Sequence, residues 1–219
     1  MKIKWYNVSA FMITTESGTR VITDPFAYNY KPQLLPLPPG FEANRPPIAE
    51  HADVVALSHG HFDHSYVGAG NIKGVFKLYT GGKPQEYKGV KFSGVTAYHD
   101  PINHNHHGFV TLNVIEADGI RVMHTGDYGQ KRLYDEQVAE LGRIDILMTA
   151  WGEWVPPLIE QLKPRVVLPM HHARIDDYMR SFKGFQDFTE KTSELEYTKR
   201  TLPSEMQVIM LKKSMETNL

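Results

Sequence analysis

Three histidines and an aspartate lie within six residues of one another, in the stretch SHGHFDHS at 58–65. His59 and His61 are two apart, so in extended backbone their side chains leave on the same side. Asp63 and His64 follow after a short bend, where a glycine helps the loop to fold back. Imidazole and carboxylate groups at this spacing predict a metal site, with the first pair on one ion and the second pair offered to another.

Neither pair is a complete coordination shell. Metals of the zinc type take about four to five ligands, and a catalytic site keeps one position for water. A lone histidine at a strand end, such as His51, is more often a hydrogen-bonded structural residue than a ligand. The clustered residues do not fit that interpretation, because packing several imidazoles beside a carboxylate has a desolvation cost unless a cation lies between them.

Further candidate ligands follow other apolar runs of strand length. The runs and the residues after them are 54–57 before His59, 90–97 before His99, 119–123 before His124 and Asp127, and 166–168 before His171. Ligands bind α/β proteins beyond the carboxyl ends of the strands. We therefore expect these strand ends to meet at one site, where His99, Asp127 and His171 complete both shells.

The rest of the chain predicts an α/β architecture. Residues 2–24 indicate two or three short strands, and 207–211 indicates a closing strand. Residues 133–141 and 156–162 are typical of helices, and we also expect surface helix over 175–199, where apolar residues lie among charges. Strands and helices of these lengths predict helices that cover a buried sheet.

Composition narrows the class of protein. The chain has 219 residues, which predicts a single domain over 1–219. It has no cysteine, which excludes disulfides, thiolate zinc sites and a cysteine nucleophile. A net charge of −1 gives no general attraction to nucleic acid. No run approaches the roughly 18 apolar residues of a membrane span, and the N-terminus lacks a signal-peptide core, so we expect a cytoplasmic protein.

The cluster matches the HxHxDH signature of the metallo-β-lactamase superfamily, and the chain resembles that family from Met1 to about Arg174. The other motifs follow in the expected order: TDPF at 23–26, His99 after a strand, GD at 126–127 and PMH at 169–171. Their surroundings look most like the branch with ascorbate-6-phosphate lactonase-like proteins and relatives of N-acylphosphatidylethanolamine phospholipase D. The resemblance implies a four-layer αββα sandwich with two metals at one edge.

The resemblance also implies a ligand set. The first metal would be held by His59, His61 and His99, the second by Asp63, His64 and His171, and both would be bridged by Asp127. Imidazole and carboxylate suit zinc, manganese or iron, and we expect zinc. The hypothesis for catalysis is that a hydroxide between the two ions attacks the substrate, while Asp63 orients it and carries a proton to the leaving group.

Several residues bear on substrate choice. The chain departs from the family where Tyr128 follows Asp127 and where His172 follows His171. The stretch HNHH at 104–107 leaves two alternatives open: one of its histidines replaces His99, or His104, His106 and His107 all line the pocket. We keep His99, because His107 leads directly into the next strand. The candidate substrate-binding residues are His107, Trp151, His172 and Arg174.

Residues of lower rank have structural alternatives. Asp24 is expected to support the histidine loop through hydrogen bonds. His124 is either a similar supporting residue or a packed core histidine. Seven of the 14 prolines fall within 25–50, and we expect this loop to be a lid or an oligomer contact.

We predict a metal-dependent hydrolase that cleaves a small phosphodiester, lactone or phosphorylated lactone. The alternatives are a dinuclear-metal oxidoreductase, a nucleic-acid-processing enzyme and a non-catalytic metal-binding module. Flavin-coupled relatives carry an added domain for which this chain has no room, the neutral charge argues against nucleic acid, and every ligand position is filled. The expected partner is a small-molecule substrate, and homo-oligomer formation is left open.

Overall fold

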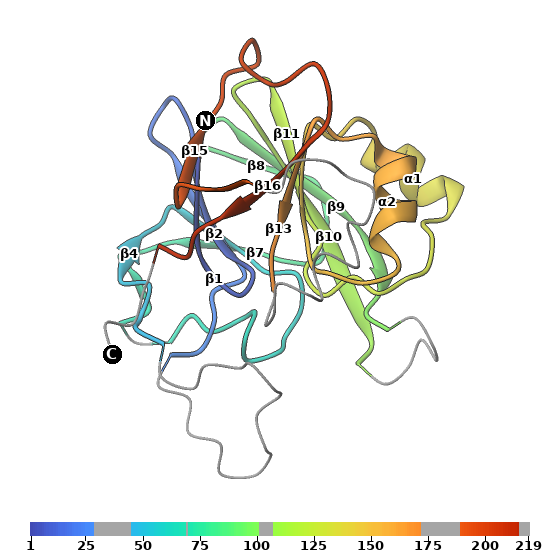
Figure 1. Ribbon diagram of the computed structural model, residues 1–219. Helices are drawn as coiled ribbons and strands as arrows, with labels where there is room; N and C mark the ends of the chain where they lie inside the picture. The colour runs from blue at the N-terminus through green and yellow to red at the C-terminus, as the bar shows by residue number, and fades with distance from the viewer. Residues whose placement is uncertain (29–44, 69, 101–106, 172–188, 215–219) are drawn as a thin grey trace.

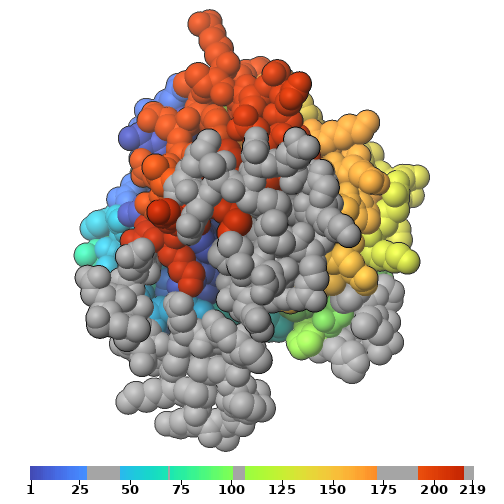
Figure 2. Space-filling model, in the orientation of Figure 1, coloured from blue at the N-terminus to red at the C-terminus, as the bar shows by residue number. Residues whose placement is uncertain are grey.

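The computed structural model describes residues 1–28, 45–68, 70–100, 107–171 and 189–214. The strands of the described residues form two sheets and a separate short pair. The six-stranded sheet has the order β15 (Glu194–Glu196), β1 (Lys2–Asn7), β2 (Ala10–Thr14), β3 (Arg20–Thr23), β5 (Val54–Ala56) and β7 (Lys77–Tyr79). In Figure 2, the orange-red segment that contains β15 lies beside the blue N-terminal strands.

The second sheet has eight strands. Its order is β14 (Thr189–Lys191), β16 (Gln207–Leu211), β13 (Val166–Pro169), β12 (Ile146–Thr149), β11 (Ile120–His124), β10 (Phe109–Ala117), β9 (Val90–Tyr98) and β8 (Gln85–Tyr87). Strands β11, β12, β13 and β16 run parallel to one another, whereas β8 to β11 are antiparallel. A separate pair joins β4 (Glu50–His51) to β6 (Ile72–Lys73).

The two large sheets enclose the main hydrophobic core. Alternating residues of β1 and β2, among them Ile3, Trp5 and Phe11, are buried against residues of the other sheet such as Phe92 and Ile146. A strand presents every second side chain to one face, so this alternation packs one sheet against the other. Figure 1 shows the two sheets side by side in the middle of the molecule.

Both described helices cover the outer face of the eight-stranded sheet (Figure 1). They are α1 (Asp135–Leu141) and α2 (Val155–Leu162). Helix α2 begins with prolines in its first turn, where the missing N–H groups have no helical partner to lose. It buries Val155, Leu158, Ile159 and Leu162, which is the spacing of one helical face. Among the described residues, no helix is long and apolar enough to cross a membrane.

The outer face of the six-stranded sheet is covered differently. Residues Phe26, Ile48 and Ile72, from loops and short strands, pack there against Ile22 and Val55. Within the described ranges, helices therefore lie on one outer face only, where the resemblance implied a helical layer on each side. The predicted sandwich fold itself is confirmed.

Most predicted elements are confirmed to within a few residues: three strands over 2–24, the strands at 54–57, 90–97, 119–123 and 166–168, both helices, and the strand at 207–211. The helix expected over 175–199 is wrong in its described part, because 189–191 and 194–196 are strands β14 and β15. Both are short edge strands, added to β16 and β1. Residues 29–44 of the proline-rich loop lie outside the described residues.

Candidate metal centre

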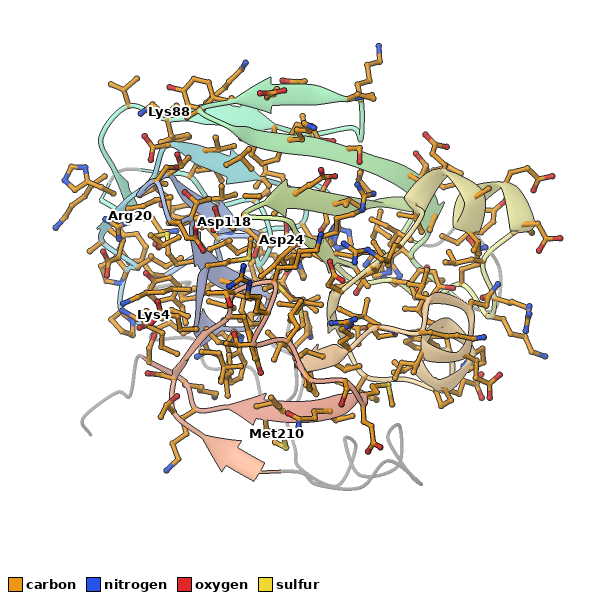
Figure 3. All side chains as sticks on the ribbon, turned by 90° about the horizontal axis from the view of Figure 1, so that it is seen from above. Lys4, Arg20, Asp24, Lys88, Asp118 and Met210 are labelled. Atoms are coloured by element: carbon orange, nitrogen blue, oxygen red, sulfur yellow. The ribbon has the colours of Figure 1, made fainter. Side chains whose placement is uncertain are left out.

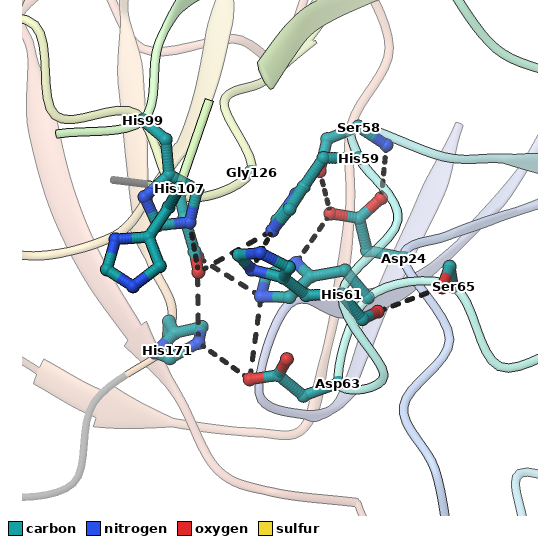
Figure 4. A network of polar contacts seen from close by, with 12 residues as sticks. Asp24, Ser58, His59, His61, Asp63, Ser65, His99, His107, Gly126 and His171 are labelled. Carbon is teal, nitrogen blue, oxygen red and sulfur yellow. Dashed lines mark hydrogen bonds and ion pairs between the residues drawn. The ribbon is translucent and has the colours of Figure 1, made fainter. Parts of the chain in front are cut away.

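Segments that follow four different strands bring the candidate ligands together, and Figure 4 shows most of them facing one another. The loop 58–65 follows β5, His99 follows β9, Asp127 lies beyond β11, and His171 lies beyond β13. In three of the four cases the strand is parallel to a neighbour. The carboxyl ends of parallel strands meet at the same edge, which explains why residues so distant in sequence share a site.

Four of the side chains form a first group. One potential ligand atom from each of His59, His61, His99 and Asp127 lies within 4.8 Å of the other three. His59 Nε2 and His61 Nδ1 are 2.9 Å apart. Asp127 Oδ2 is 3.9 Å from His59 Nε2 and 3.5 Å from His99 Nε2. His99 therefore joins the pair that begins the HxHxDH motif.

Asp63, His64 and His171 form a second group of the same kind. Asp63 Oδ2 lies 3.4 Å from His171 Nε2 and 3.8 Å from His64 Nε2. The other oxygen of Asp127, Oδ1, lies 3.1 Å from His64 Nε2 and 3.5 Å from His171 Nε2. One carboxylate thus directs one oxygen to each group, which is the arrangement that a bridging ligand requires.

The chemistry of these atoms fits a pair of divalent cations. His64 Nε2, His99 Nε2, His171 Nε2 and Asp127 Oδ1 are buried without a hydrogen-bond partner among the described residues. An unpaired buried polar atom costs about 1–3 kcal/mol, and four of them converge here. Imidazole nitrogen and carboxylate oxygen are the donors that zinc and related ions take.

Asp24 makes hydrogen bonds that support residues of both groups. It is fully buried at the end of β3, and in Figure 3 it lies inside the molecule while Lys4, Arg20 and Lys88 lie near the rim. Its carboxylate accepts hydrogen bonds from the Ser58 amide (2.7 Å), the Ser58 hydroxyl and His64 Nδ1 (2.8 Å). Burial favours the neutral acid, but the hydrogen bonds from His64 and Ser58 hold the pKa of Asp24 below its usual range.

This carboxylate fixes the tautomers of two histidines. Because Asp24 only accepts, His64 Nδ1 carries the proton, and the Nε2 lone pair faces the second group. Ser58 donates to Asp24 and accepts from His59 Nδ1, which is 2.9 Å from the Ser58 hydroxyl. The Nε2 lone pair of His59 therefore faces the first group. Contacts of this kind orient metal-binding histidines.

The turn that carries Asp127 depends on close packing. Gly126 has φ of +54°, and a Cβ there would lie 2.3 Å from the Ser58 hydroxyl oxygen. Its amide donates to Nδ1 of the fully buried His124 (3.2 Å), whose Nε2 donates to the Ser9 carbonyl (2.8 Å). Burial lowers the pKa of His124, in keeping with a neutral ring that uses both nitrogens. His124 is therefore a buried residue that also supports the Asp127 turn.

His171 is held through its backbone. Its φ of +56° is unusual for a residue other than glycine. Its amide donates to the Val8 carbonyl (2.9 Å), and its carbonyl accepts from Trp151 Nε1 (2.9 Å). Trp151, proposed from the sequence as a substrate residue, is thus also a support for His171.

Burial disfavours the ionised forms of the histidines and carboxylates in the cluster, and their pKa values reflect the balance between burial and neighbouring charges. Burial lowers the pKa of His59 to about 3, and the nearby His64 adds to the effect. Burial also disfavours the charged form of His64, yet Asp127 and Asp24 hold its pKa well above the usual value. Asp127 is partly buried, with 18% of its side chain exposed, and His171 and His64 keep its pKa well below the usual value. Without a cation, protons on the imidazoles compensate the carboxylates, and a cation would replace them.

His107 lies next to the cluster, and its side chain is 55% exposed. Both its amide and its Nδ1 bond to the Asp100 carboxylate, at 2.9 Å and 2.8 Å. Its ring centre is 5.0 Å from that of His99. The sequence did not single out Asp100, since no local spacing links it to His107. His104, His106, His172 and Arg174 lie outside the described residues.

A cavity of about 200 Å³ adjoins the cluster. It shares His99, Asp127 and His171 with the cluster, and its aromatic wall consists of Tyr128, Trp151 and Trp154. Tyr128 is almost completely buried, and burial raises the pKa of its hydroxyl, so it is a neutral donor. Sequence reasoning noted Tyr128 only as a departure from the family pattern; the partnership with Trp154 arises from the fold.

Known proteins with similar sequences also support the interpretation of the cluster as a metal centre. The family described as "Beta-lactamase superfamily domain" matches residues 2–171. A "UPF0173 metal-dependent hydrolase" from Pyrobaculum neutrophilum is 30% identical, over 78% of this chain and 84% of the relative. Another of that name from Anaeromyxobacter dehalogenans is 27% identical, over 78% of this chain and 74% of the relative.

The fold also has a similar crystal structure, that of a candidate Zn-dependent hydrolase of the metallo-β-lactamase superfamily from Thermotoga maritima. Its TM-score is 0.71 at 27% identity, with 96% of this chain and 97% of that chain covered. The part of the chain that the family matches includes all seven side chains of the cluster.

Proposed function

The chain belongs to the metallo-β-lactamase superfamily, and on that premise we propose that it is a dinuclear metal-dependent hydrolase of a small ester-type bond. The bond belongs to a lactone, a phosphodiester or a phosphorylated lactone. The relatives carry the description of metal-dependent hydrolases. The observation that carries the proposal is the division of the Asp127 carboxylate, with one oxygen toward each group of ligand atoms.

The chain supplies ligands for two ions. His59, His61 and His99 would hold the first, while Asp63, His64 and His171 would hold the second, and Asp127 lies between the two groups. Two divalent cations bound there would supply an activated water and would draw charge from the reacting bond. Zinc suits this set of imidazoles and carboxylates, and manganese and iron suit it too.

Asp63 has the position of a proton carrier as well as a ligand. Its side chain is 15% exposed, so solvent reaches part of it. Burial favours the neutral acid, but the nearby His171 and His64 hold the pKa of Asp63 below its usual value. An ionised Asp63 can orient the attacking water and pass its proton to the leaving oxygen.

Within the metal-dependent hydrolases, we propose that the chain belongs to the lactonase-like branch. The neighbouring cavity favours it, because a small ring fits there beside the ligands. Neither an oxidoreductase nor a nucleic-acid enzyme has a comparable observation in its favour.

The experiment is a turnover assay with metal-loaded protein and a chelated control. The substrates are dihydrocoumarin, a neutral aromatic lactone, and a chromogenic phosphodiester. We expect metal-dependent cleavage of at least one, and we expect Asp63→Asn to abolish it, with the bound metal of that variant measured alongside. Turnover that survives chelation, or no turnover of either compound with two metals bound, would contradict the proposal.

A further inference from the structure

Two of the residues that line the aromatic cavity beside the metal centre carry unpaired donors. Tyr128 Oη and Trp154 Nε1 are buried and have no hydrogen-bond partner within the described part of the chain. Buried donors are almost always paired, and leaving one unpaired destabilises a fold. Indole N–H donates only, and a neutral phenol readily donates, so both groups call for an acceptor oxygen. Both residues line the cavity next to the metal ligands.

The aromatic wall is fixed by packing. A Cβ on Gly152 would lie 2.2 Å from Cζ2 and 2.3 Å from Cε2 of Trp154, so only glycine lets this indole lie where it does. Trp151 is held by its hydrogen bond to the His171 carbonyl. Tyr128 packs in the core beneath the helices. The two donors are therefore presented by rigid side chains.

The size and character of the cavity indicate what it binds. Its volume is about 200 Å³. An apolar cavity of about 150 Å³ accommodates benzene, so a single ring with small substituents fits. Aromatic walls bind planar, neutral rings through their faces. Asp100 also lines the cavity, and its negative charge disfavours an anionic ligand there.

We propose that this cavity binds a neutral ring bearing an oxygen acceptor, which Tyr128 Oη and Trp154 Nε1 hold by hydrogen bonds. The inference rests on the hydrolase proposed above and narrows its substrates to neutral lactones and aryl esters, in preference to phosphodiesters. A phosphate would be better held by charge-assisted bonds from arginine or lysine than by two uncharged donors.

The test measures binding separately from turnover. 2-Pyridone, the lactam counterpart of the lactone 2-pyranone, is a single planar ring that resists hydrolysis, and calorimetry with metal-loaded protein gives its affinity. The lactone 2-pyranone serves for the kinetic measurements. Tyr128→Phe and Trp154→Phe each remove one N–H or O–H donor and keep an aromatic ring. We expect each to weaken lactam binding about tenfold and to raise KM for the lactone with little change in kcat.

Tyr79→Phe is the matched control. The Tyr79 hydroxyl is also buried without a partner among the described residues, but Tyr79 lies in the core between the sheets. Removal of an unpaired hydroxyl should raise the melting temperature of both Tyr128→Phe and Tyr79→Phe. Only Tyr128→Phe should lose affinity for the lactam.

The outcomes separate the two proposals. Unchanged lactam binding in both Tyr128→Phe and Trp154→Phe, or no binding by wild type, would overturn the cavity assignment even if the enzyme hydrolyses lactones. Lactam binding that both variants weaken, without any ester hydrolysis, would support the cavity and contradict the hydrolase. A phosphodiester that binds as tightly and loses affinity in the same variants would overturn the preference for neutral rings. Metal content is measured for every variant. If Tyr128→Phe loses metal, the binding result for Trp154→Phe is the one that tests the cavity assignment.

Discussion

Replacement of Asp24 by asparagine tests whether one buried carboxylate positions both halves of the metal centre. Asp24 accepts two hydrogen bonds from Ser58 and one from His64 Nδ1. Asparagine has one acceptor oxygen and an NH₂ group, so at least one of the three donors would face another donor. If the NH₂ group takes the place of Oδ2, which accepts from His64, His64 can escape this conflict only by moving its proton to Nε2, which removes the lone pair that the metal needs.

The size of the effect follows from those contacts. Each lost hydrogen bond to a charged group is worth about 1.5–3 kcal/mol, so we expect metal-free Asp24→Asn to lose about 3 kcal/mol of unfolding free energy. For a chain of this length that loss lowers the melting temperature by about 6–12 °C. Changes to residues that orient metal ligands weaken metal binding about 10- to 100-fold.

The assay is zinc affinity by competition with a chromophoric chelator, together with thermal unfolding of the chelated protein. Chelation matters because bound metal would itself stabilise the fold. Asp53→Asn is the control. Asp53 forms an ion pair with Lys88 and accepts from the Arg20 amide, away from the cluster. Surface pairs of this kind contribute about 0–1 kcal/mol. Wild-type zinc affinity in Asp24→Asn would refute the reasoning, because the two histidines would then be oriented without the carboxylate.

Other predictions concern the same site. In metal-free protein the neighbouring carboxylates raise the pKa of His64 despite burial, so a cation must displace a proton to bind. Metal affinity should therefore rise by up to about tenfold per pH unit until the pH passes that pKa. Calorimetry at several pH values measures this rise. The protonated His64 correspondingly stabilises the chelated protein at low pH, and this contribution should be lost as the pH rises through the raised pKa. Trp151→Phe removes the donor to the His171 carbonyl and should cost about 1 kcal/mol in urea unfolding, with metal affinity reduced. Gly126→Ala should cost more than about 2 kcal/mol and reduce bound metal, because its Cβ would meet Ser58 at a positive φ; wild-type stability would contradict the packing described.

Local patterns in the sequence were enough to predict much of the site. The HxHxDH motif lies in one loop, and apolar runs that end in histidine or aspartate mark the strand ends that surround it. Buried parallel strands have nearly continuous apolar sequences, so the sequence predicts β5 and β13 directly. The four buried positions of α2 have the spacing of one helical face.

Other features depend on contacts between distant segments. Leu195 alternates with two glutamates over only three residues, and its partner in the sheet is Ile3, far away in sequence. So short an edge strand cannot be distinguished from helix by periodicity. Asp100 and His107 pair across a loop, and Tyr128 and Trp154 line the same cavity although they come from different segments of the chain. No local spacing predicts these pairs.

The most direct test of the dinuclear centre is the number of metal ions per chain, measured by elemental analysis after dialysis. We expect two in wild type, about one in His61→Ala and in His171→Ala, and less than one in Asp127→Ala, because that carboxylate is shared. Two ions retained by Asp127→Ala, or a single ion in wild type at saturating zinc, would contradict a centre bridged by Asp127.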